Sequence, residues 1–237
     1  MIDNRVNIVL CCDENYYVPL SVCMTSILEN IGSTAKPSFH LFVEGFSEST
    51  KKQFRLFLQR YDCEILFYDM GKYKDMFSEI SESNFNLKHI TISTMYRLLL
   101  FDILPKEVEK VFYIDTDMII NCDLQKLYSQ LHDDDLAFAV VEPIAMKHRL
   151  TILKHLYTIP EFKNFVASPR EYPYFNAGFL AINLKKAREL DIYKQLIEVV
   201  KHYPGLPYAD QDILNMVLGQ IHRDKIKYIP LEYNVFC

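Results

Sequence analysis

The chain has 237 residues, of which 50% are hydrophobic and 24% are charged, the balance of a soluble globular protein with a sizeable core. Its formal net charge of -5 argues against a nucleic acid partner, because neutralising phosphates requires a basic surface. The six cysteines form no C-x-x-C pair, which favours buried free thiols over disulfides or a zinc site. We therefore expect a single domain over residues 1–237.

The N-terminal residues do not resemble a signal peptide, because polar side chains interrupt a short apolar run at Asp3, Asn4, Arg5 and Asn7. No stretch of the sequence is long and apolar enough to span a bilayer. These features predict a cytoplasmic protein, with peripheral association at the inner membrane face as the alternative.

Strand and helix patterns alternate along the first half of the chain, which is typical of an α/β protein. A run over 6–10 that is apolar except for Asn7 predicts a buried parallel strand, and 17–30 predicts a helix that tolerates Pro19 in its first turn. The following pattern predicts, in order, a strand over 39–43, a helix over 47–60 opened by Ser47, a strand over 65–68, an irregular segment over 69–89, and a helix over 93–101 capped by Thr91 or Ser93. This half predicts a Rossmann-like arrangement.

The second half mixes its elements less regularly. It predicts strands over 111–114, 136–141, 179–182 and 226–229, and helices over 190–203 and 209–218. Residues 146–165 are helical in part, but Pro160 interrupts them, so we expect a mobile lid there. The whole pattern predicts a twisted, mostly parallel sheet flanked by helices, and such sheets bind ligands beyond the carboxyl ends of their strands.

Two carboxylates, Asp115 and Asp117, follow the apolar strand predicted over 111–114. They point to the same side if the strand continues through them, and a bend would still let both approach one cation. Carboxylate oxygens suit Mg²⁺ or Mn²⁺, and these ions often bridge protein carboxylates to a pyrophosphate. Taken alone, the motif fits a solvated acidic turn equally well.

Polar residues also follow the first predicted strand. Asp13 could accept a hydrogen bond from a base, Asn15 could bind a ribose, and Tyr16 could stack on a base. The alternative is an ordinary strand-to-helix turn with a polar cap. No G-x-G-x-x-G motif follows this strand, so neither a dinucleotide site nor a phosphate-binding loop of the Walker type is predicted.

Three later positions carry groups suited to a phosphate or a sugar. Arg97 lies in a predicted helix, Asn176 precedes the small pair Ala177-Gly178, and Asp210 with Gln211 opens another predicted helix. Each has a structural alternative, namely a surface salt bridge, a tight turn and the charge preference of a helix N-terminus. A functional role requires that these side chains face the same pocket.

Together and in this order, the motifs resemble glycosyltransferase family 8, a retaining family that includes bacterial lipopolysaccharide galactosyl- and glucosyltransferases, glycogenin and galactinol synthase. The resemblance covers nearly the whole chain and rests on residues 8–16, 93–98, 113–117, 175–178, 209–212 and 231–234. Each motif is weak alone, but their order and spacing are specific.

The resemblance implies a GT-A fold, a UDP-glucose or UDP-galactose donor, and a glycan or glycolipid acceptor. It implies Mn²⁺, or Mg²⁺, bound by Asp115 and Asp117, and catalytic roles for Arg97, Asp210 and Gln211. By the same resemblance, Asp13, Asn15 and Tyr16 hold the uridine and Thr116 lies near the ribose. The donor sugar is then surrounded by Arg97, Asn176, Asp210 and Gln211. The substrate-binding residues so implied are Cys11, Asp13, Asn15, Tyr16, Thr116, Arg97, Asn176, Ala177, Asp210 and Gln211.

The chain departs from the family in one respect. The third metal ligand of the family is a His in a late H-x-x-G-x-x-K-P segment, and His222 does not match that motif. We therefore expect a domain without the family's C-terminal segment, and without its diphosphate-contacting lysine, in which the donor-binding half is complete.

Retention of configuration requires either a covalent intermediate or attack from the leaving-group face. Gln211 is a poor nucleophile because an amide oxygen is weakly basic, and Asp210 is chemically better suited. We favour same-face attack in which the departing UDP accepts the acceptor's proton.

Three other functions remain open from the sequence. One is a catalytically impaired UDP-sugar-binding module, which would bind UDP without transferring a sugar. Another is a haloacid-dehalogenase-type phosphatase, although that family carries its D-x-D near the N-terminus and has Thr or Val where this chain has Ile119. The third is a nucleotidyltransferase that releases pyrophosphate.

Overall fold

The structure is a computed structural model that describes residues 4–77, 92–142, 173–203, 206 and 208–235. The predicted lid over 146–165, the Thr91 cap and most of the irregular segment over 69–89 lie outside the described residues. The five described cysteines are free thiols, of which Cys12 and Cys23 are buried as predicted, whereas Cys11, Cys63 and Cys122 are half-buried.

The described strands form one seven-stranded sheet in the order β3-β2-β1-β4-β6-β5-β7. Their bounds are β1 Arg5–Asp13, β2 Lys36–Glu44, β3 Glu64–Asp69, β4 Lys110–Ile114, β5 Ala137–Val141, β6 Phe175–Asn183 and β7 Ile226–Ile229. Only β6 runs antiparallel to its neighbours, β4 and β5, and the other adjacent pairs are parallel. The predicted mostly parallel sheet is therefore confirmed for this part of the chain.

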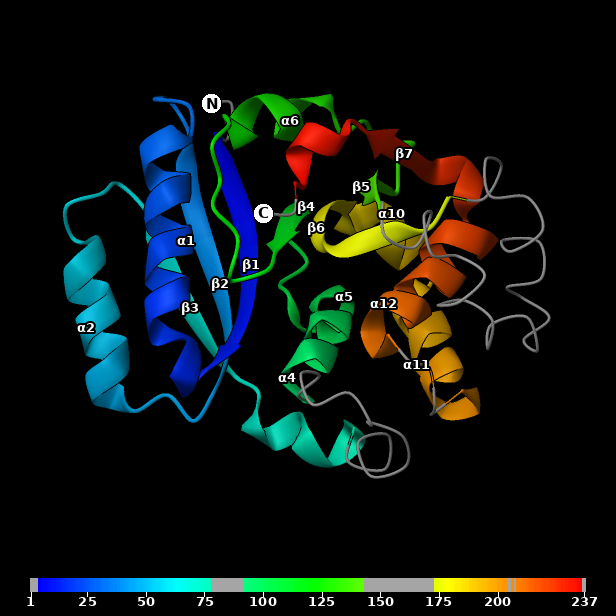
Figure 1. Cartoon of the computed structure of the whole chain (residues 1–237), viewed down its shortest axis with the longest axis horizontal. Helices are drawn as coiled ribbons and strands as arrows, with labels where there is room; N and C mark the ends of the chain where they lie inside the picture. The colour runs from blue at the N-terminus through cyan, green and yellow to red at the C-terminus, as the bar shows by residue number, and fades with distance from the viewer. Residues whose placement is uncertain (1–3, 78–91, 143–172, 204–205, 207, 236–237) are drawn as a thin grey trace.

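Alternate residues of each strand enter two hydrophobic cores, one on each face of the sheet. Ile8 pairs with Phe112 in one core, and their neighbours Val9 and Tyr113 pair in the other. The first face is covered by α1 Tyr17–Asn30, α2 Glu48–Leu58 and α6 Leu124–Gln130. The second is covered by α4 Ile92–Met95, α5 Leu100–Ile103, α10 Leu184–Glu189, α11 Ile192–His202 and α12 Ala209–Leu214. Figure 1 shows α1 and α2 beside β1 to β3, with α11 and α12 beyond β6.

The helices agree with the sequence where a cap or a long apolar face defined them. The bounds of α1 match the prediction, and the Ser47 hydroxyl accepts a hydrogen bond from the Thr50 N–H at 3.1 Å to begin α2. The helix predicted over 93–101 is instead α4, a 3₁₀ turn and α5 in succession, and α12 continues as a π-helix over Asn215–Ile221.

Two short helices, α6 and α10, were not predicted. Each begins after a side-chain cap: the Asp123 carboxylate accepts from the Gln125 N–H at 3.0 Å, and the Asn183 side chain accepts from the Lys186 N–H at 2.9 Å. The caps were visible in the sequence, but the helices span only seven and six residues, too few for a periodic pattern.

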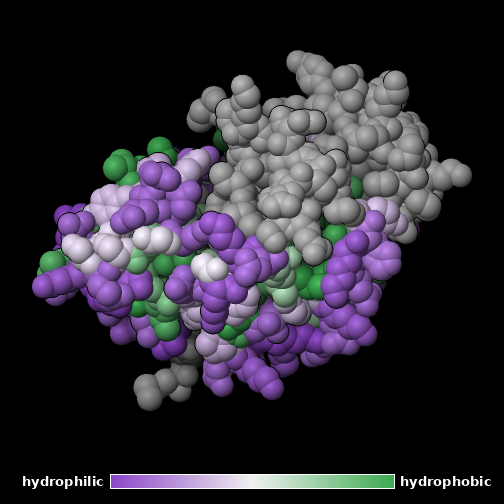
Figure 2. All heavy atoms as spheres, turned by 90° about the horizontal axis from the view of Figure 1, so that it is seen from below, coloured by the Kyte–Doolittle hydropathy of each residue, from purple (hydrophilic) through white to green (hydrophobic). Residues whose placement is uncertain are grey.

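Within the described residues, no helix combines the length and the apolar character needed to cross a bilayer. On the face drawn in Figure 2, the described surface is largely hydrophilic, and hydrophobic residues appear in small separate patches.

Candidate functional site

The carboxyl end of β4 delivers Asp115 and Asp117 to a cavity of about 800 Å³. The strand ends at Ile114 and a turn follows at residues 116–117, so of the two arrangements that the sequence left open the chain adopts the bend. The Asp115 N–H donates to the Gly178 carbonyl at 2.8 Å, which ties the bend to β6. The cavity is lined by Asp115, Asp117, Met118, Ile119, Ile120, Asn121, Cys122, Asn176, Gly178, Phe179, Glu232, Tyr233, Asn234 and Val235.

The two carboxylates repel each other in this cavity. Burial, followed by the charge of Asp115, raises the pKa of Asp117 above its ordinary value. Gly178 lets Asp115 approach the chain closely, since a Cβ there would lie 2.7 Å from Asp115 Oδ2. Two neighbouring hard oxygen donors fit a divalent cation, although the described residues contain no group of three or more His, Cys, Asp or Glu arranged for one.

Arg97 lies behind these carboxylates and joins three elements. Its Nη2 is 3.0 Å from Asp115 Oδ1, its Nε is 2.8 Å from Asp210 Oδ2, and its Nη1 donates to the Ala177 carbonyl at 3.0 Å. The guanidinium also covers the Tyr113 ring at 4.5 Å. Arg97 is only 8% exposed, so the surface salt bridge considered for it is wrong, and its ion pair with Asp210 is buried.

Burial and neighbouring charges shift the pKa values of Arg97 and Asp210 in opposite directions. Burial disfavours the charge on Arg97, but Asp115 and Asp210 outweigh it and raise the pKa of the guanidinium. Burial also raises the pKa of Asp210 to about 6, against the lowering effect of Arg97. The 2.8 Å contact between Arg97 and Asp210 favours the charged pair at neutral pH.

Side chains of α12 and of the π-helix after it hold these helices against the backbone of β6. The Gln211 Oε1 accepts from the Ala177 N–H at 2.9 Å, and the Asn215 side chain bonds both the N–H and the carbonyl of Phe175 at 2.9 Å. Ala209 has a φ of 41°, a strained value for a residue with a Cβ, directly before Asp210. These contacts bring Asp210 and Gln211 beside the small residues of β6.

Asn176 forms a second network at the cavity. Its Oδ1 accepts from the Gly178 N–H and from Asn234 Nδ2, both at 2.8 Å, and its Nδ2 donates to Glu142 Oε2 at 2.7 Å. Glu142 and Asn234 are each 7% exposed, and sequence reasoning assigned a role to neither. No pattern pointed to Glu142, whereas Asn234 lies in one of the segments that carry the family resemblance.

The predicted uridine residues lie at the end of β1, the neighbour of β4 in the sheet. The Asp13 carboxylate accepts from the Asn15 N–H at 2.8 Å, so Asp13 also serves as the cap proposed as its alternative role. Asn15 is exposed and Tyr16 is 45% exposed, while Thr116 is buried. None of these four is among the described residues that line the cavity.

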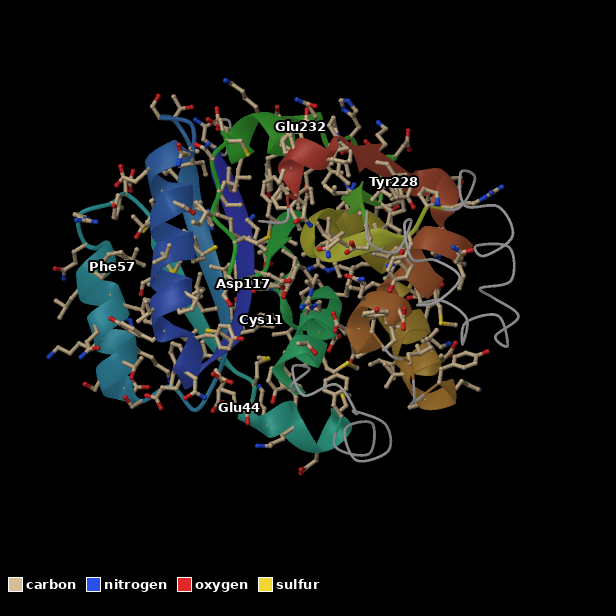
Figure 3. The ribbon with its side chains drawn as sticks, viewed as in Figure 1. Cys11, Glu44, Phe57, Asp117, Tyr228 and Glu232 are labelled. Atoms are coloured by element: carbon tan, nitrogen blue, oxygen red, sulfur yellow. The ribbon has the colours of Figure 1, made fainter. Side chains whose placement is uncertain are left out.

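Arg97, Asp115 and Asp210 are called the Arg97 cluster below. Cys11, near the end of β1, lies close to it. Burial raises the pKa of its thiol, and among the charges that act on it are Arg97, Asp115 and Asp210. Figure 3 labels Cys11 and Asp117, which lie near one another in the view beside β1. The structure thus brings Asp115, Asp117 and Asn176 into one cavity, links them through Arg97 and β6 to the start of α12, and leaves the residues after β1 on the adjacent strand end.

The family model described as glycosyl transferase family 8 matches residues 7–237. Among curated relatives, the lipopolysaccharide 1,2-glucosyltransferase of Escherichia coli is 27% identical over 94% of this chain and 60% of its own length. The lipopolysaccharide 1,3-galactosyltransferase of Salmonella typhimurium is 25% identical over 98% of this chain and 64% of its own length. The chain thus spans less than two thirds of the length of these two relatives.

A solved structure gives the same result. The crystal structure of the galactosyltransferase LgtC in complex with donor and acceptor sugar analogues superposes with a TM-score of 0.73 and 27% identity, covering 95% of this chain and 74% of LgtC. The fold is therefore the GT-A fold, as the resemblance predicted. With the family model matching from the first strand onward, this chain belongs to glycosyltransferase family 8.

Proposed function

We propose that this chain is a metal-dependent retaining glycosyltransferase domain that moves glucose or galactose from a UDP-sugar to a glycan or glycolipid acceptor. The observation that carries the proposal is the pair of carboxylates, Asp115 and Asp117, in one cavity and connected through Arg97 to Asp210. The names of the relatives, a glucosyltransferase and a galactosyltransferase of lipopolysaccharide, support the donor and acceptor classes. With a glycolipid acceptor, we propose that the chain works peripherally at the cytoplasmic face of a membrane.

The nucleotide would bind at the ends of β1 and β4. In this proposal, Asp13, Asn15 and Tyr16 hold the uridine, Cys11 lies beneath it, and Thr116 lies near the ribose. The exposure of Asn15 and Tyr16 supports the proposal, because both side chains can meet a ligand without rearranging the core.

Asp115 and Asp117 would hold Mn²⁺ or Mg²⁺, which when bound supplies positive charge to the diphosphate. Arg97 orients Asp115 rather than the donor directly, since its nitrogens already face Asp115, Asp210 and the Ala177 carbonyl. The arrangement keeps the Asp115 carboxylate in a fixed direction at the cavity before any ligand arrives.

The donor sugar would lie against β6 and α12, near Asn176, Ala177, Asp210 and Gln211. Asp210 is paired with Arg97, and Gln211 carries a weakly basic amide, so neither is well suited to attack an anomeric carbon. Same-face attack is therefore favoured, with the leaving diphosphate accepting the acceptor's proton. A trapped glycosyl adduct on Asp210 would contradict this mechanism.

The proposal is tested by screening UDP-sugars with and without Mn²⁺ while recording both thermal shift and UDP release. We expect UDP-glucose or UDP-galactose to raise the melting temperature only with the metal and to release UDP when an acceptor is present. Binding without UDP release would instead select a UDP-sugar-binding module. Phosphate release from a phosphoester, with no dependence on UDP, would select a phosphatase.

A further inference from the structure

Asp212 is a buried carboxylate for which the proposed mechanism has no use. It is 0% exposed, and both of its oxygens have partners: Oδ1 accepts from the Tyr174 hydroxyl at 2.6 Å and Oδ2 from the Tyr208 N–H at 2.9 Å. Burial raises the pKa of Asp212 to about 6, while these two hydrogen bonds lower it. A carboxylate enclosed in this way can act on a ligand only through the groups that it touches.

Tyr174 is the group that connects Asp212 to the site. Its hydroxyl donates its single hydrogen to Asp212, so toward any other neighbour the oxygen can only accept. Gln211 Nε2 lies 3.4 Å from that oxygen and donates to it. Tyr174 is 3% exposed, which keeps competing water away from this contact.

The two ends of the Gln211 amide therefore face different kinds of hydrogen-bonding group. Its Oε1 faces the Ala177 N–H, which can only donate, and its Nε2 faces the Tyr174 oxygen, which can only accept. An amide side chain can turn by half a rotation and exchange oxygen for nitrogen with little change of shape. Here both contacts favour the same orientation, and the Tyr174 contact does so only while Asp212 holds the hydroxyl hydrogen.

We propose that Tyr174 and Asp212 are positioning residues that fix which way the Gln211 amide points at the donor sugar. The inference rests on the proposed function for its consequence, since Gln211 belongs to the proposed sugar site. Without Asp212, the Tyr174 hydroxyl can rotate and donate toward Gln211, and the two ends of the amide then lose their distinction.

The first test measures the orientation itself and needs no turnover. In the full chain, the side-chain NH₂ signals of Gln211 are assigned by their loss in Gln211→Ala. We expect Tyr174→Phe, which keeps the ring, to shift these signals and to speed their hydrogen exchange by about tenfold, as loss of one hydrogen bond implies. Asp212→Asn should act in the same direction if it folds. Unchanged signals in Tyr174→Phe would overturn the inference.

The matched control is Tyr128→Phe. The Tyr128 hydroxyl donates to the Lys110 carbonyl at 2.6 Å, at the opposite end of β4 from Asp115, so this variant loses a comparable hydrogen bond away from the site. It should leave the Gln211 signals unchanged. An equal shift in the control would mean that the signals report general loosening, and this would also contradict the inference.

The second test is a double-mutant cycle on UDP-sugar turnover. We expect Tyr174→Phe to lower kcat about tenfold while changing KM for the UDP-sugar less than about twofold. In a Gln211→Ala background the same change should have no further effect, because the residue acts through Gln211. A full additional loss would indicate a general structural role and overturn the inference. If the unaltered chain neither binds nor turns over UDP-sugars, the proposed function fails, and the amide signals still decide whether Tyr174 orients Gln211.

Discussion

Two buried polar clusters lie on the same sheet, and they differ in charge. In the His40 cluster, which joins β1 to β3, the His40 Nδ1 lies 2.9 Å from the Tyr68 hydroxyl and its Nε2 lies 3.3 Å from Asn7 Oδ1. Burial lowers the pKa of His40 to about 4, so the ring is neutral near pH 7. This cluster satisfies its polar groups with neutral hydrogen bonds.

The Arg97 cluster satisfies its polar groups with ion pairs instead of neutral hydrogen bonds. It holds Arg97 in ion pairs with Asp115 and Asp210 and places one edge at a cavity, where Asp117 adds another carboxylate. A polar cluster that serves the fold alone gains nothing from retained charge, because burying charge is costly. Charge that is retained beside a cavity is therefore the feature that separates the candidate site from ordinary buried polar structure.

The largest effect is expected from Arg97→Met, which leaves the buried Asp210 and the half-buried Asp115 without their counter-charge. We expect the free energy of unfolding to fall by about 3–5 kcal/mol and metal-dependent UDP-sugar binding to be lost. Urea denaturation and thermal shift measure the two outcomes. Arg188→Met is the control, since Arg188 donates to the carbonyls of Leu104 and Val108 outside the cavity. Equal losses in both variants would remove the proposed distinction.

Asp115→Asn tests whether the charge at the cavity serves a ligand. We expect metal-dependent turnover to fall about a thousandfold, because the metal loses one charged ligand and Arg97 loses one charged partner. The measurement is UDP release at saturating Mn²⁺, with Mn²⁺ affinity determined separately by titration calorimetry. Asp134→Asn, in an exposed loop, should leave both unchanged. Undiminished activity in Asp115→Asn would remove the metal assignment.

For the His40 cluster we expect a pH dependence of folding stability rather than an effect on donor binding. Between pH 6.5 and about pH 4 the unfolded chain binds a proton at His40 and the folded chain does not, so His40 lowers the stability by roughly 3 kcal/mol as the pH falls through this range. Asp210 and Asp212, whose pKa values are raised to about 6, act in the other direction over part of it.

The contribution of His40 to stability is therefore measured as the difference in the free energy of unfolding between the wild type and His40→Gln. Relative to the wild type, His40→Gln should become more stable by roughly 3 kcal/mol as the pH decreases from 6.5 to 4, measured by urea denaturation at each pH. Donor binding at pH 7 should not change. A difference between the two proteins that stays constant with pH would show that His40 is already charged in the folded state.

The smallest effect is expected from Gly178→Ala. The new Cβ would lie 2.7 Å from Asp115 Oδ2 and 2.9 Å from Asn176 Oδ1, so one of these groups must move. We expect metal-dependent donor binding to weaken about tenfold, with little change in stability. In the control, Gly71→Ala, the Cβ would meet only Asp69 Oδ1 at 3.2 Å, away from the cavity. Equal binding in the two variants would show that the cavity adjusts freely.

Local patterns predicted most of the scaffold. The apolar run that became β1 and the capped start of α2 carry their signals within a few residues, so periodicity and capping were sufficient. The same reasoning did not find α6 or α10, nor the π-helix after α12, because short helices and helix irregularities depend on packing rather than on local pattern.

The candidate site was predicted in its chemistry but not in its connections. Asp115, Asp117 and Asn176 could be named because they follow or begin strands, and Arg97, Asp210 and Gln211 because they lie in predicted helices; the family resemblance then implied that they share one site. The roles assigned to these residues remain predictions. Glu142 was missed because nothing near it in the sequence shows that its carboxylate would meet a side chain of β6.

The sequence by itself determined the strands, the main helices and the two acids at the end of β4, because each is encoded by the spacing of residues close together in the chain. Only the tertiary structure decided that Arg97 pairs with Asp210 and that Tyr174 stands between Gln211 and Asp212. The physical reason is the sheet order, which inserts β6 antiparallel beside β4 and so brings the start of α12 to the carboxyl ends of β1 and β4. That order follows from the packing of two cores over the whole chain, which no local spacing records.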